Sequence, residues 1–142
     1  MLVACGAAQP ESTFDRPSST VRFPRADATL HVRIADADGE RRRGLMNVEH
    51  LPKDEGMAFV YPDPSTSSFW MKNTLIPLSI AFVGEDGRVI GFRDMTPCEA
   101  DPCPMYGVDD AYLLAIEANP GWFEEHGIDV GDRAELRVSE PG

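Results

Sequence analysis

Basic residues are scarce in this chain, which has 13 lysines and arginines against 24 aspartates and glutamates and a formal net charge of -11 at pH 7. A negative charge of this size repels phosphate backbones and anionic headgroups over a Debye length of about 8 Å at physiological salt. The basic run Arg41-Arg42-Arg43 is more typical of a solvated or ion-paired helix face than of a binding patch. The sequence therefore predicts that nucleic acid is not a partner.

Metal-binding side chains are also sparse, because the chain contains only three histidines and three cysteines. A structural zinc site needs four ligands, usually two Cys pairs or a Cys pair with a spaced His pair. The histidines, at His31, His50 and His126, are instead scattered singly. Methionine thioethers could bind copper(I), but methionine is more often a core residue. We therefore expect no metal ion or other cofactor.

Cys98 and Cys103 lie five positions apart in a proline-rich segment. If the remaining Cys5 carries a lipid, these two are left as an even pair, and a disulfide is their natural pairing. Closing so short a loop would stabilise the fold by about 2 kcal/mol in the chain-entropy model. Zinc binding is the alternative interpretation, which the scattered histidines disfavour.

No apolar run is long enough to span a membrane, and no internal repeat is visible. The start of the chain, Met1–Cys5 followed by Gly6, resembles the end of a bacterial lipoprotein signal, in which a small residue precedes a lipid-bearing cysteine. The basic start and apolar stretch of a complete signal are missing. We interpret residues 1–19 as a truncated signal remnant and flexible tether, with coincidence as the alternative. The expected location is extracytoplasmic, with membrane attachment only through a lipid on Cys5.

Residues 20–142 are expected to form a single monomeric domain, since 142 residues of which 42% are hydrophobic can bury one core. The pair Asp86-Gly87 between two apolar runs predicts a β-hairpin. Short strands without alternating long helices favour a mostly β (α+β) fold, a compact antiparallel barrel-like domain with two short helices. Strands are predicted over residues 29–34, 57–61, 69–71, 78–83, 88–92, 111–117 and 134–138, and helices over 40–46 and 122–126.

Four separated motifs lie between Thr29 and Val138. They are Glu40-Arg41 with Gly44-Leu45-Met46, Gly56-Met57-Ala58-Phe59, Phe69-Trp70-Met71-Lys72-Asn73-Thr74 with Pro77-Leu78, and Ile116-Glu117-Ala118-Asn119 with Gly121-Trp122. In these motifs the chain resembles the bacterial and archaeal family known as domain of unknown function 192. The resemblance implies the type of domain but no chemical reaction. Val48 stands where that family often carries Arg, and Ser79 where Asp commonly follows Pro-Leu. We infer that the two charged groups pair in relatives, so a mechanism that uses the Asp as a base is in doubt here.

The third motif sets a lysine and two hydrogen-bonding side chains beside a large aromatic pair. If the motif is a strand, Trp70 and Lys72 share one face while Met71 points to the core. No Ser-His-Asp spacing or nucleophile elbow is visible, so we assign no catalytic residue. We favour a non-catalytic module that binds a sugar, another amphipathic small molecule or a protein partner. Its candidate binding residues are Trp70, Lys72, Asn73, Thr74 and Glu117.

Two alternatives to the binding hypothesis stay open. A hydrolase-like or other enzyme could act at the same surface through Lys72 or Glu117. A structural role is equally compatible with the sequence, because Glu117 could hold Lys72 as an ion pair while Asn73 and Thr74 satisfy turn backbone.

Overall fold

The computed structural model describes residues 16–139, which form one seven-stranded sheet and two short helices. The strands follow the order β6-β5-β7-β4-β3-β2-β8 across the sheet, and all neighbours are antiparallel except the parallel pair β3 and β4. The elements are β2 (Ser19–Phe23), β3 (Ala28–Ala35), α2 (Asp38–Arg43), β4 (Glu55–Ser65), β5 (Leu78–Val83), β6 (Val89–Met95), β7 (Tyr112–Ala118), α3 (Trp122–Glu125) and β8 (Glu135–Arg137).

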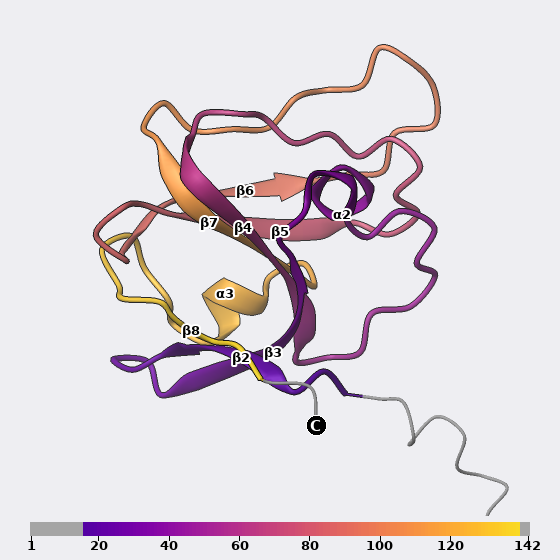
Figure 1. Cartoon of the computed structure of the whole chain (residues 1–142). Helices are drawn as coiled ribbons and strands as arrows, with labels where there is room; N and C mark the ends of the chain where they lie inside the picture. Colours follow the sequence, from indigo (N-terminus) through magenta and orange to yellow (C-terminus); the bar gives the residue numbers. More distant parts are fainter. Residues whose placement is uncertain (1–15, 140–142) are drawn as a thin grey trace, which may run out of the picture.

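The predicted α+β class with two short helices is confirmed, although the sheet is open rather than a closed barrel. Figure 1 shows that the sheet is strongly curved, with α3 inside the curve. Its two edges approach where the first residue of β6 meets the segment before β8: the Val89 N–H donates to the Asp132 carbonyl (2.8 Å) and the Gly131 N–H to the Val89 carbonyl (2.8 Å). These few backbone bonds bring the ends of the sheet together without pairing β6 and β8 along their length.

Burial on both faces of the central strands explains the sequence of β5, in which all six residues are buried. Ala81 and Val83 pack into one core cluster with Trp122, whereas Ile80 and Phe82 pack into a second cluster on the opposite face. A strand that is covered on both sides reads as a continuous apolar run rather than an alternating one. The second cluster is the one that borders the candidate site.

The strand predicted over residues 69–71 is absent. Residues 69–72 form only isolated bridges, Phe69 with Tyr106 and Lys72 with Cys98. The two long connections, residues 66–77 and 96–111, therefore lie side by side at one end of the sheet (Figure 1). The seventh strand is instead β2, in which Val21 and Phe23 are fully buried.

The predicted tether meets the sheet at its last residue, because Ser19 begins β2. Cys5 and the rest of residues 1–15 lie outside the described residues, so the lipid anchor stays a prediction. Among residues 16–139, neither helix is long and apolar enough to cross a membrane.

Candidate functional site

A pocket of about 330 Å³ opens between α2, the end of β7 and the 66–77 connection. Its walls combine basic, aromatic and sulfur-containing side chains with one buried carboxyl group. The lining residues are Arg41, Arg42, Arg43, Gly44, Leu45, Met46, Phe59, Tyr61, Ser68, Phe69, Trp70, Thr74, Met105 and Glu117.

The buried carboxyl group in this pocket belongs to Glu117. It lies on β7 between Met57 of β4 and Ile80 of β5, and strand alternation places it on the same face as Ala115 of the second core cluster. The residue is only 5% exposed, and no group within residues 16–139 forms a hydrogen bond or ion pair with its carboxyl. Burial raises the pKa of Glu117 from 4.5 to about 8, so the neutral acid is the main form at pH 7 and can donate a hydrogen bond.

Arg41, Arg42 and Arg43 are the last three residues of α2. Among them, only the Arg41 side chain forms hydrogen bonds within residues 16–139. Its guanidinium donates to the Val60 carbonyl (2.7 Å) and to Asp38 (2.6 Å), and it lies 5.0 Å from the centre of the Tyr61 ring. Arg42 and Arg43 are exposed and make no side-chain hydrogen bond or ion pair within residues 16–139. The predicted solvated or ion-paired helix face fits all three residues, because Arg41 is ion-paired and Arg42 and Arg43 are exposed to solvent.

Gly44 ends α2 and sets the arginines close to the pocket wall. Its φ of 50° lies in the left-handed region, and a Cβ there would come within 3.2 Å of the Phe59 ring. A side chain at this position would be both strained and crowded, which explains the glycine after the arginine run.

Trp70 and Lys72 do lie together, but the ion pair between Lys72 and Glu117 is not formed. Trp70 is 41% exposed, and the Lys72 ammonium lies 5.4 Å from the centre of its ring. The ammonium is paired with Asp101 (3.0 Å). Lys72 is not part of the pocket lining, because the segment is a bridged loop rather than a strand and its residues do not simply alternate.

The other candidates divide between pocket and surface. Thr74 is 7% exposed and lines the pocket, while its N–H donates to the Met71 carbonyl (3.1 Å). Asn73 is exposed with a φ of 61°, and its carbonyl accepts from the Asn47 N–H (2.9 Å). Of the five candidate residues, the pocket brings together Trp70, Thr74 and Glu117.

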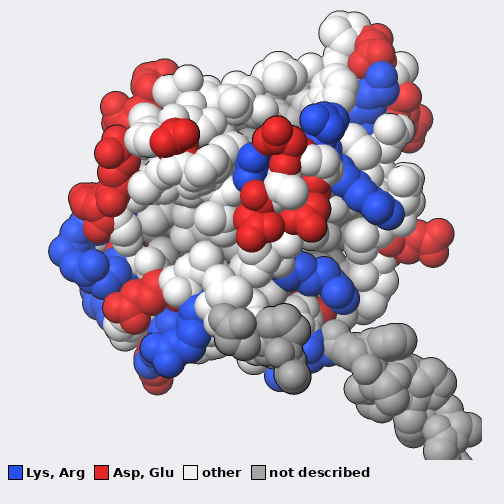
Figure 2. Space-filling view, in the orientation of Figure 1, with Lys and Arg blue, Asp and Glu red and all other residues white. Residues whose placement is uncertain are grey.

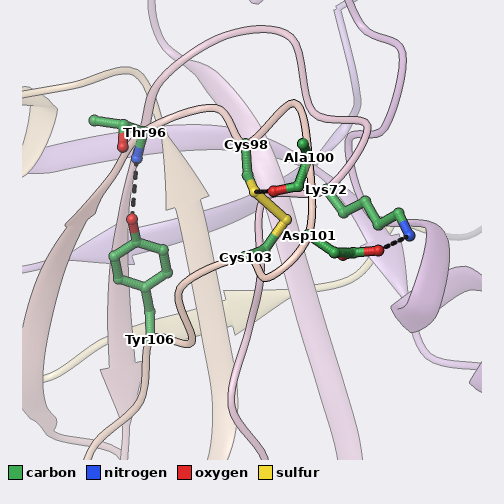
Figure 3. The surroundings of a disulfide bond; sticks show 7 residues. All are labelled: Lys72, Thr96, Cys98, Ala100, Asp101, Cys103 and Tyr106. Atoms are coloured by element: carbon green, nitrogen blue, oxygen red, sulfur yellow. Dashed lines mark hydrogen bonds and ion pairs between the residues drawn. A yellow bond between two sulfur atoms is a disulfide. The ribbon is translucent and has the colours of Figure 1, made fainter.

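The predicted disulfide is present, with 2.11 Å between the sulfur atoms of Cys98 and Cys103. Figure 3 shows that the closed loop carries Asp101 toward Lys72. Met105, two residues after Cys103, lines the pocket. The disulfide loop therefore supports the outer wall of the site. Within residues 16–139, no group of three or more His, Cys, Asp or Glu side chains is arranged to hold a metal ion.

Ser79, one of the two positions that differ from the family pattern, lies in a second cavity of about 330 Å³. It is 4% exposed, and its hydroxyl donates to Asp94 (2.9 Å) and accepts from the Gly121 N–H (3.1 Å). Val48 packs against the second core cluster. Because the Ser79 hydroxyl is satisfied on both sides, this position has a structural role here.

Sequence reasoning missed the contribution of Arg42, Arg43, Tyr61 and Met105 to the pocket. The arginine run was visible, but its position at a pocket depends on the packing of α2 against β3. Tyr61 and Met105 carry no local signal, since each joins the site through contacts between distant segments.

The fold and the site define a class of protein: a small α+β domain with an open curved sheet and a pocket that encloses a carboxyl group. The chain belongs to the DUF192 family, described as uncharacterized ACR, whose model matches residues 21–136.

Two solved structures share the fold. A protein of unknown function from Novosphingobium aromaticivorans is 32% identical, with 82% of each chain covered and a TM-score of 0.74. A candidate transcription regulator from Sinorhizobium meliloti is 25% identical, with 83% of this chain and 91% of that chain covered and a TM-score of 0.71. No curated protein matches the chain.

Proposed function

We propose that this protein is a non-catalytic module that binds a small molecule in the Glu117 pocket. The observation that carries the proposal is a carboxyl group that is 5% exposed and has no partner within residues 16–139. The carboxyl group lies in the pocket lining, so its hydrogen-bonding capacity is open to a ligand that accepts from Glu117. The volume of about 330 Å³ matches the lower end of ligand pockets.

Binding accounts for the site better than catalysis does. Lys72, which the enzyme hypothesis pairs with Glu117, is held by Asp101 outside the pocket lining. Apart from Glu117, the titratable groups that line the pocket within residues 16–139 are three arginines and Tyr61. Burial raises the pKa of Tyr61, so this phenol also stays neutral. The lining therefore offers Glu117 no second group suited to proton transfer near neutral pH.

The charge of this chain argues against the role of transcription regulator given to the Sinorhizobium meliloti protein. A formal charge of -11 opposes contact with a phosphate backbone, and binding to DNA rests on neutralising phosphates with Lys and Arg.

A thermal-shift screen of a broad set of small molecules tests the binding proposal. Ser68 lines the pocket and is exposed, so Ser68→Phe should fill the entrance, whereas Thr66→Phe adds the same ring on exposed surface outside the lining. We expect compounds that stabilise the parent and Thr66→Phe but lose their effect in Ser68→Phe. A screen without stabilising compounds, or shifts that persist in Ser68→Phe, would contradict the proposal.

We further propose that the protein works outside the cytoplasm and is anchored through a lipid on Cys5. The disulfide between Cys98 and Cys103 supports this location, because such bonds are rare in reducing compartments. Mass spectrometry of the membrane fraction should find lipid on Cys5, and Cys5→Ala should release the protein from that fraction. Recovery of the unmodified protein in the cytoplasm would sink the hypothesis.

A further inference from the structure

The charge around the pocket entrance differs from that of the whole chain. The protein has 24 acidic and 13 basic residues, yet Arg42 and Arg43 stand side by side in the lining. Figure 2 shows basic side chains over the part of the molecule that α2 occupies, beside a group of acidic ones. The Arg41 guanidinium is already bound to Asp38 and to the Val60 carbonyl. Arg42 and Arg43 have no such partner within residues 16–139, so their donors are available to a ligand.

The pocket wall between the entrance and Glu117 is largely apolar. Phe59 and Phe69 meet edge to face, with ring centres 5.1 Å apart, and both line the cavity. Trp70 and Met105 add exposed apolar surface at 41% and 61% exposure. Exposed aromatic and methionine side chains in a lining are suited to the apolar body of a small ligand.

Resting on the binding function proposed above, we infer that the ligand is a small organic anion with an apolar body and a second hydrogen-bond acceptor. Arg42 and Arg43 bind its charged group, the aromatic wall holds its body, and Glu117 donates to the acceptor at the inner end. Arginine is well matched to carboxylate and phosphate groups because its planar fork donates two parallel hydrogen bonds. The neutral form of Glu117 does not repel an anion, consistent with the effect of burial on its pKa.

Three probe compounds separate these features. 4-Methoxyphenylacetate carries the anion and the acceptor, 4-methoxyphenylacetamide replaces the anion by a neutral amide, and 4-ethylphenylacetate lacks the ether oxygen. Binding is followed by NMR through the indole N–H of Trp70, which lines the pocket. The indole of Trp122 is an internal control, because it is buried and donates to Asp54 (2.9 Å).

We expect 4-methoxyphenylacetate to bind about tenfold more tightly than its amide, as charge-assisted hydrogen bonds are stronger than neutral ones. The double substitution Arg42→Gln/Arg43→Gln should abolish this preference and leave the affinity for the amide unchanged. The control Arg33→Gln/Arg93→Gln changes the net charge equally at exposed positions outside the lining, and should keep the preference. Glu117→Leu should make the methoxy and ethyl acids bind alike.

Equal binding of acid and amide, or a preference that survives Arg42→Gln/Arg43→Gln, would overturn the anion assignment. Shifts of the Trp70 indole in those same titrations would still support ligand binding in the pocket. If none of the three probes shifts the Trp70 indole, the proposed ligand class is wrong. The thermal-shift comparison of Ser68→Phe with Thr66→Phe then decides independently whether the pocket binds any other ligand.

Discussion

At the scale of single residues, Glu117 is the group whose chemistry the fold alters most. Strand β7 carries it between β4 and β5, where a mostly apolar surrounding raises its pKa to about 8. The charged groups that line the same pocket are Arg41, Arg42 and Arg43, and none forms an ion pair with it within residues 16–139. The protein therefore keeps a neutral acid where ionisation would be unfavourable.

Glu117 should make stability depend on pH in a definite direction. The folded-state pKa lies above the unfolded value of 4.5, so its favourable contribution is fully present below about pH 4.5 and is lost as the pH rises through about 8. Glu117→Gln stays neutral and should escape this loss. We expect it to be more stable than the parent at pH 9 by on the order of 3 kcal/mol, and similar at pH 4.

Urea denaturation from pH 4 to pH 9 measures this difference. Glu85→Gln is the control, since Glu85 is exposed in the turn between β5 and β6 and should follow the parent at every pH. Parallel stability curves for Glu117→Gln and the parent would show that the carboxyl is not held neutral.

At the scale of elements, the disulfide loop and the 66–77 connection stabilise each other where no regular strand pairing exists. Lys72 forms a bridge with Cys98, and its ammonium pairs with Asp101 inside the closed loop. Trp70 lies beneath that ammonium at the pocket edge. The position of the tryptophan therefore depends on a covalent loop more than on the ion pair, which is partly exposed on both sides.

Cys98→Ser/Cys103→Ser should lower the free energy of unfolding by about 2 kcal/mol, because the unfolded chain regains the freedom of the open loop. It should also make Trp70 more accessible to acrylamide, while buried Trp122 contributes little to the quenching. Guanidinium denaturation and fluorescence quenching measure the two effects.

Lys72→Met is the companion variant for this experiment. It removes the ion pair with Asp101 but leaves the loop closed, and should cost less than about 1 kcal/mol because the pair is exposed. A loss in Lys72→Met as large as that of the double cysteine variant would show that the ion pair, rather than the disulfide, holds the wall.

At the scale of the whole molecule, short sequence patterns predicted the features that depend on residues close together in the chain. Asp86-Gly87 marked the β5–β6 hairpin, and the spacing of Cys98 and Cys103 marked the disulfide. The parallel pairing of β3 with β4 had no such signal, because strand order is set by contacts between distant segments. The pocket was missed in part for the same reason: Arg42 and Glu117 are distant in sequence and line the same cavity only in the folded chain.

A long-range contact near the approaching edges of the sheet provides the last prediction. Arg25, in the turn between β2 and β3, donates through Nε and Nη2 to the carboxylate of Asp132, 107 residues away. The Asp129 N–H also donates to this carboxylate (2.8 Å), which is 8% exposed. The Arg25 hydrogen bonds, followed by that from the Asp129 backbone, lower the pKa of Asp132 from 3.8 to about 2.

Asp132→Asn should therefore lower the melting temperature at pH 7 by roughly 4 °C, since it weakens a charge-assisted contact between the two ends of the fold. The folded-state pKa is depressed, so the stabilisation is present above about pH 3.8 and is lost as the pH falls through about 2. The difference between parent and variant should shrink accordingly between pH 4 and pH 2. Asp129→Asn is the matched control, because that carboxylate is 80% exposed and lies 3.5 Å from Arg25. Calorimetry that finds the two variants equal at pH 7, or a difference that does not shrink in acid, would contradict the assignment of this contact.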